Sequence, residues 1–202
     1  MSEYFIRLAR LNGWKNPKGV RAVFKPGMGF DSSRKWWGDH GSRQSVHEGL
    51  DVVFLQGSDG SIHPVGSGFK VLPVQPGTMV RLCRDFLGWT VILSHGRTDS
   101  ESRELLSLYA HLEMDQALST GDWVSVEDIL GKTVQSDALP ADMLPHLHIS
   151  LAWNERPFAY DHLEWPRLSR RDGIRFLDPL PWIEEGKRMN LQLQSSSSRT
   201  KM

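Results

Sequence analysis

The segment from Pro145 to Ser150 reads Pro-His-Leu-His-Ile-Ser and so places two histidines two residues apart. Alternate side chains share one face of a β-strand. A strand here would therefore point His146 and His148 to the same side, while Leu147 and Ile149 would face a core on the other side. This arrangement predicts a polar face suited to a metal ion, backed by a packed apolar face.

A second cluster, His-Glu-Gly-Leu-Asp at residues 47–51, brings an imidazole and a carboxylate four residues apart. In extended backbone this even spacing also places both groups on one side. Catalytic zinc takes three protein ligands from histidine and carboxylate and keeps a fourth position for water. His47, Asp51 and one histidine of the pair would make such a set. His111, in the segment Leu-Tyr-Ala-His-Leu, is a further candidate for acid–base work.

The three motifs H-x-G-x-D, Y-A-H-L and H-L-H occur in this order, and together they resemble the lysostaphin and LytM-type zinc metallopeptidases. The resemblance extends from about Gly41 to Trp182. It implies that His47, Asp51 and His148 bind zinc, whereas His111 and His146 flank the zinc-bound water and the substrate carbonyl. Either of these last two histidines fits the role of base or of oxyanion stabiliser.

Members of that family cut peptide bonds in bacterial cell-wall cross-links or related peptides. Zinc lowers the pKa of its bound water toward ~7 and polarises a carbonyl, and a histidine can exchange the proton at neutral pH. The resemblance therefore implies a zinc metalloendopeptidase acting on peptidoglycan cross-links. Two alternatives are a catalytically silent member that binds peptidoglycan or activates another hydrolase, and an intracellular metal-dependent hydrolase of some other peptide.

Glycines and prolines recur from Lys25 to Gly88 and separate short apolar runs, a pattern that predicts antiparallel β-structure. The runs are residues 51–55, 68–73, 79–83 and 89–94, with a turn at 58–61. Residues 100–112 fit both a helical and an alternating pattern, and only the resemblance favours a strand there. We therefore predict an all-β, mainly antiparallel sheet that forms a groove, with surface loop insertions.

The chain is expected to hold one zinc metallopeptidase domain at residues 28–185, preceded by an N-terminal extension at 1–27 and followed by a disordered tail at 186–202. Residues 96–104 and 158–173 are interpreted as surface insertions that shape or cover the cleft. The loop at 136–145 replaces the glycine-rich turn usual in the family with a bulkier, proline-bracketed sequence. Substrate specificity is therefore expected to differ.

Composition narrows the possible partners and sites. Lys plus Arg and Asp plus Glu both count 24, so no excess charge favours nucleic acid. The single cysteine, Cys83, excludes an intramolecular disulfide and a cysteine-based zinc cage. The apolar runs are too short for a membrane span, and the N-terminal residues show no signal peptide, although the resemblance implies a periplasmic or extracellular location. Nothing in the sequence indicates the oligomeric state.

Histidines outside the three motifs, and several tryptophans, are interpreted as structural. The histidines are expected to be surface or hydrogen-bonded side chains: His40, His63, His95 and His162. The tryptophans Trp36, Trp37 and Trp153 are expected to pack in the core or at the rim of the groove.

Overall fold

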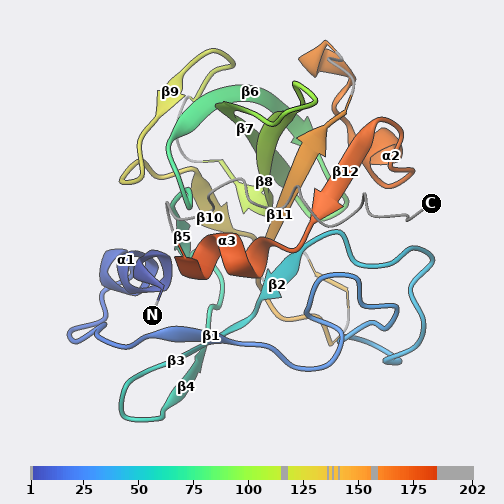
Figure 1. Ribbon diagram of the computed structural model, residues 1–202. Helices are drawn as coiled ribbons and strands as arrows, with labels where there is room; N and C mark the ends of the chain where they lie inside the picture. Colours follow the sequence, from blue (N-terminus) through green and yellow to red (C-terminus); the bar gives the residue numbers. More distant parts are fainter. Residues whose placement is uncertain are drawn as a thin grey trace, which may run out of the picture.

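The computed structural model describes residues 2–114, 118–135, 137, 139–140, 142–155 and 159–185. Its main sheet has nine strands and every strand pairing is antiparallel (Figure 1). The central path runs in the order β12 (Ile174–Leu177), β11 (Leu147–Asn154), β8 (Glu104–Glu113), β7 (Trp89–Thr98), β6 (Gly77–Arg84) and β9 (Trp123–Val124). The strands β2 (Leu50–Val52), β5 (Lys70–Val71) and β10 (Gly131–Thr133) join this path through β11 and β8. The predicted all-β, mainly antiparallel class is confirmed.

A smaller sheet lies beside the main one and contains β1 (Arg21–Val23), β3 (Phe54–Gln56) and β4 (Ile62–Pro64). The single strand expected at residues 51–55 is therefore divided between two sheets. Its first part, β2, pairs with β11, whereas its second part, β3, pairs with β1 and β4. Continuous apolar sequence predicts an extended segment, but it does not reveal where that segment changes partners.

Alternation along β11 divides its side chains between two cores. Leu147, Ile149 and Leu151 enter the larger core, whereas Ala152 enters a second core on the other face together with Leu106. The expected orientation of Leu147 and Ile149 is confirmed. The ambiguous segment around residue 105 is the central strand β8, as the family resemblance implied.

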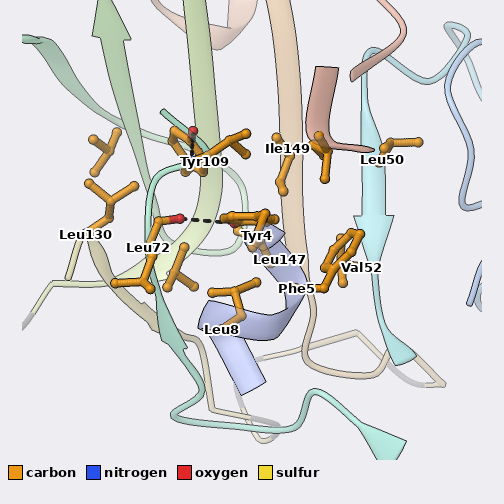
Figure 2. Packing of buried hydrophobic residues seen from close by; sticks show 14 of the residues in the cluster. Tyr4, Phe5, Leu8, Leu50, Val52, Leu72, Tyr109, Leu130, Leu147 and Ile149 are labelled. Carbon is orange, nitrogen blue, oxygen red and sulfur yellow. Dashed lines mark hydrogen bonds between the residues drawn. The ribbon is translucent and has the colours of Figure 1, made fainter. Parts of the chain in front are cut away.

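Helix α1 (Glu3–Leu11) packs into the larger core. Its buried residues Tyr4, Phe5 and Leu8 follow helical spacing, and Figure 2 shows them close to Val52 and Leu147 from the sheet. The Tyr4 hydroxyl also donates a hydrogen bond of 3.0 Å to the backbone oxygen of Leu72. The N-terminal helix and the sheet thus share one core. The domain boundaries themselves stay a prediction, and the tail at 186–202 lies outside the described residues.

Three further helical segments of the described residues follow the end of β11. They are the 3₁₀ segment η2 (Tyr160–His162), α2 (Trp165–Leu168) and α3 (Pro179–Glu185). Of these, α2 lies in the region interpreted as an insertion, next to β12 in Figure 1. None of the helices in the described ranges has the length and apolar character needed to cross a bilayer.

Candidate metal centre

The pairing of β2 with β11 creates the first part of the site, because it places Asp51 directly opposite His148. His47 precedes β2 and reaches the same point through Gly49. A Cβ atom on Gly49 would lie 2.2 Å from the backbone oxygen of Ile149 in β11. Only glycine allows the two backbones to approach so closely, which explains the glycine between the histidine and the aspartate.

Three side-chain atoms meet at this point. His47 Nε2 lies 3.1 Å from Asp51 Oδ1 and 3.2 Å from His148 Nδ1, and His148 Nδ1 lies 2.9 Å from Asp51 Oδ1. Tetrahedral ligands held at about 2.0–2.1 Å from zinc would be roughly 3.3–3.4 Å apart. The observed separations are a few tenths of an ångström shorter, so the cluster has the dimensions of a metal site.

Hydrogen bonds behind these atoms are compatible with a cation between them. His47 Nδ1 lies 2.9 Å from the Gly29 carbonyl, which can only accept, so this nitrogen carries the proton and Nε2 carries a lone pair. His148 Nε2 lies 2.7 Å from Ser150 Oγ, a hydroxyl that can accept a proton from the ring or donate one to it. In the tautomer in which Ser150 accepts, two imidazole lone pairs and a carboxylate oxygen converge on one point. The buried donor set fits a divalent metal ion.

Electrostatics favours the protonation states that metal ligands require. Burial lowers the pKa of His148 to about 4, and that of His146 to about 4, so both rings are neutral at pH 7. Burial opposes ionisation of Asp51, but the neighbouring imidazoles, His47 first, outweigh it and hold the pKa of this carboxyl well below its usual value. The cluster therefore offers a neutral imidazole at His148 and a carboxylate at Asp51.

The second oxygen of Asp51 faces away from the two histidines and is held by other side chains. Trp36 Nε1 donates to Asp51 Oδ2 at 2.7 Å, and Arg43 Nη2 lies 3.4 Å from the same atom. Trp36 is only 7% exposed, so it packs in the core as predicted, but it also orients the carboxylate. That second role was missed, since a tryptophan fifteen residues before an aspartate has no recognisable spacing.

His146 and His111 stand beside the three candidate ligands. The Nδ1 atom of His146 donates to the Leu144 carbonyl at 2.8 Å, while its Nε2 lies 3.7 Å from Asp51 Oδ1. The rings of His111 and His146 are 4.9 Å apart, and those of His111 and His148 are 5.6 Å apart. The structure thus brings together all five residues that the sequence singled out.

A β-bulge turns His111 toward this cluster. In β8, Ala110 lies opposite His148, so in a regular strand the next residue would point to the other face. The β7–β8 register shifts at this point, and His111 adopts φ +65°, a conformation that is unusual for a residue other than glycine. The side-chain alternation is reversed afterwards, since Leu112 enters the larger core together with Tyr109.

The five residues lie in an open groove of about 510 Å³. Phe86, from the turn between β6 and β7, is 71% exposed and its ring lies 5.0 Å from that of His111. Trp165 from α2 and Met143 from the loop before β11 also line the groove. The region interpreted as an insertion and the atypical loop therefore both contribute side chains to the groove.

The remaining histidines lie away from the cluster. His40, His63 and His162 are exposed. His95 contacts the Pro76 carbonyl and Ser107 Oγ, each at 2.8 Å, and so forms hydrogen bonds within the fold. Sequence reasoning missed Asp85, whose carboxylate lies 3.1 Å from His111 Nδ1, because this residue belongs to an unremarkable turn.

Comparisons with known proteins agree with the motifs. The model of peptidase family M23 matches residues 45–160, more than half of the chain and all five site residues. No curated protein matches the sequence.

The chain is similar to several solved structures. One is a putative peptidase M23 from Pseudomonas aeruginosa, which is 18% identical in sequence and gives a TM-score of 0.43; the match covers 81% of this chain and 53% of that chain. Lysostaphin gives 18% identity over 80% of this chain and 50% of its own, with a TM-score of 0.47. The catalytic domain of a mutant of the prophage-encoded M23 protein EnpA from Enterococcus faecalis gives 18% identity over 70% of this chain and 95% of its own, with a TM-score of 0.40. The chain spans about half the length of the first two.

Proposed function

This chain belongs to peptidase family M23, a family of metallopeptidases, and from this premise we propose that it is an active zinc endopeptidase in which His47, Asp51 and His148 hold the metal. One observation carries the proposal: two imidazole nitrogens and a carboxylate oxygen, all buried, converge within 3.2 Å of one another. Buried acceptors without protons between them repel one another unless a cation joins them.

Zinc is the metal that this donor set suits best. Two imidazoles and one carboxylate form a common catalytic zinc set, with a fourth position left for water. Harder ions such as Mg²⁺ and Ca²⁺ prefer more oxygen ligands than this site offers. Other first-row ions bind similar ligands, so the identity of the metal has to be measured.

The residues beside the metal site supply proton transfer. When bound, zinc provides a water of lowered pKa and polarises the scissile carbonyl. His111 and His146 both donate through Nδ1 to acceptors behind them, so each presents Nε2 to the groove. A carboxylate stabilises an imidazolium better than a carbonyl does. His111, backed by Asp85, is therefore the residue that holds the transferred proton, and His146 assists at the carbonyl side.

The proposed substrate is a peptide within peptidoglycan cross-links. The groove is open, which suits an extended peptide that is part of a larger polymer. Such a substrate places the protein in the periplasm or outside the cell. A catalytically silent member that binds peptidoglycan through the same groove is the alternative, since a complete ligand set permits turnover but does not require it.

The test combines metal content with peptide cleavage. The purified protein, His148→Ala, His111→Ala and the control His63→Ala are analysed for zinc by mass spectrometry and assayed on peptidoglycan and pentaglycine. We expect one zinc per chain that is lost only in His148→Ala, and cleavage that is lost in both site variants but kept in the control. Zinc without any cleavage would favour the binding alternative, and absence of metal would refute the proposal.

A further inference from the structure

Asp85 lies in the turn after β6, directly behind His111, and its side chain is only 1% exposed. Its Oδ1 accepts from His111 Nδ1 at 3.1 Å and its Oδ2 from the His111 backbone N–H at 3.0 Å. The backbone N–H groups of Leu87 and Gly88 also donate to Oδ1 at 2.8 and 2.7 Å. Burial opposes ionisation of Asp85, but the hydrogen bonds outweigh it and hold its pKa below the usual range.

The contact with Asp85 supports the strained backbone that aims His111. A bulge leaves one residue without its place in the strand ladder, so the N–H of that residue needs another acceptor. Asp85 supplies this acceptor and also receives the ring proton. One carboxylate therefore fixes both the φ +65° backbone and the side chain of His111.

Thr90 extends the contact away from His111. It belongs to β7 at the position of the register shift and is completely buried. Its hydroxyl donates to Asp85 Oδ2 at 2.8 Å and accepts from Trp165 Nε1 at 2.7 Å. Trp165 opens α2, and its ring lies 5.8 Å from that of His148.

Every proton in this chain of hydrogen bonds has a defined direction. The indole N–H of Trp165 can only donate, so the hydroxyl of Thr90 accepts from it and uses its single proton toward Asp85. The ionised carboxylate can only accept, so His111 Nδ1 must carry a proton. In the neutral ring, His111 Nε2 then carries the lone pair, on the groove side.

We propose that Asp85, Thr90 and Trp165 are positioning residues that fix the orientation and the Nδ1–H tautomer of His111, so that the α2 region becomes part of the catalytic apparatus. This inference rests on the proposed function for its kinetic consequences. The tautomer and the orientation can nevertheless be observed without any activity. The wrong tautomer would present a proton where a base needs a lone pair.

The first test observes His111 directly. Long-range ¹H–¹⁵N spectra of the zinc-loaded protein identify the tautomer of each histidine, with His111→Ala used for assignment. We expect the Nδ1–H tautomer at His111 in the native protein and a mixture of tautomers in Asp85→Asn, with one zinc still bound in both. A single unchanged tautomer in Asp85→Asn would overturn the proposal, as would loss of zinc, because the carboxylate would then support the metal ligands instead.

The second test separates positioning from structural support by kinetics, on whichever of peptidoglycan and pentaglycine the native protein cleaves. We expect kcat to fall on the order of 100-fold in Asp85→Asn and about tenfold in Thr90→Val and Trp165→Phe, with KM nearly unchanged. Thr90→Ser keeps the hydroxyl and should restore activity. Trp123→Phe, at an indole 68% exposed on β9, should behave like the native protein.

The outcomes distinguish this inference from the proposed function. A native-like kcat in Thr90→Val would overturn the positioning role of the Thr90 hydroxyl. A kcat lowered equally in Thr90→Ser would also overturn it, because that variant keeps the hydroxyl. If the native protein cleaves neither substrate, the proposed function fails, but the tautomer of His111 in Asp85→Asn still decides whether Asp85 positions this ring.

Discussion

The two carboxylate oxygens of Asp51 have different tasks. Oδ1 faces the two candidate metal-binding histidines, whereas Oδ2 accepts from Trp36 Nε1 at 2.7 Å. The hydrogen bond to Oδ2 restricts rotation of the carboxylate, so Oδ1 stays directed at the candidate metal position. Hydrogen bonds to metal ligands typically change metal affinity by about 10–100-fold when they are removed.

Trp36→Phe should therefore weaken zinc binding by about tenfold or more while leaving the ring volume mostly filled. The measurement is competition with a chromophoric zinc chelator. Trp37→Phe is the matched control, because Trp37 makes an edge contact with the Trp36 ring and a cation–π contact with Arg43, but its indole is not the donor to Asp51. Equal zinc affinity in the two variants would show that the indole N–H does not hold the carboxylate.

At the residue scale, spacing in the sequence predicted the histidines and Asp51 but not the groups behind them. The alternation in β11 correctly placed His146 and His148 on one side. His47 also approaches Asp51, although it precedes β2 and only Asp51 lies within that strand. Asp85 and Trp36 come from turns and loops whose approach depends on the tertiary fold, so no local pattern indicates them.

Among the elements, the junction of β2 with β11 bears most directly on the site. Asp51 and His148 lie opposite each other in this pair, so any displacement of the two strands separates candidate ligands. Gly49 sits at the closest approach, where an added Cβ would meet the Ile149 carbonyl at 2.2 Å. The strand contact and the metal site therefore depend on the same glycine.

Gly49→Ala should destabilise the fold by about 1–3 kcal/mol and abolish stoichiometric zinc binding, because β2 must move away from β11. Urea unfolding and zinc content measure the two effects. Gly29→Ala is the control, since an added Cβ there meets nothing within 4 Å and the carbonyl that accepts from His47 is retained. A Gly49→Ala protein with native stability and full zinc content would contradict the close approach.

Element types were predictable where the pattern was unambiguous. The strands β6 and β7 follow the apolar runs that the sequence shows at 79–83 and 89–94. The strand β8 fitted two periodicities, and its bulge at His111 is set by hydrogen bonds to Asp85 that the sequence pattern does not encode. The change of sheet between β2 and β3 was likewise hidden within one continuous run.

On the scale of the whole molecule, the core joins distant parts of the chain around the site. Helix α1, β2 and β11 all contribute to the larger core, while β6, β8 and the α2 region contribute to the second core. The sequence predicted one domain with Leu147 and Ile149 facing a core, but the contribution of α1 to that core depends on packing against strands far along the chain. Cys83 lies in the second core, and it reports on the integrity of the sheet.

Burial raises the pKa of the Cys83 thiol to about 11, above its ordinary value of 9.0. The native state therefore binds this proton more tightly than the unfolded state, so the contribution of the thiol to stability is complete below pH ~9 and is lost as pH rises toward 11. We expect the stability advantage over Cys83→Ala to shrink on the order of 2 kcal/mol across this interval. Urea unfolding of both proteins from pH 8 to 11 measures the difference in their free energies of unfolding. The effects of all other titrating groups are the same in both proteins and cancel in this difference. Parallel stability curves would contradict a buried thiol, and rapid labelling of the native protein by a thiol reagent at pH 8 would do so independently.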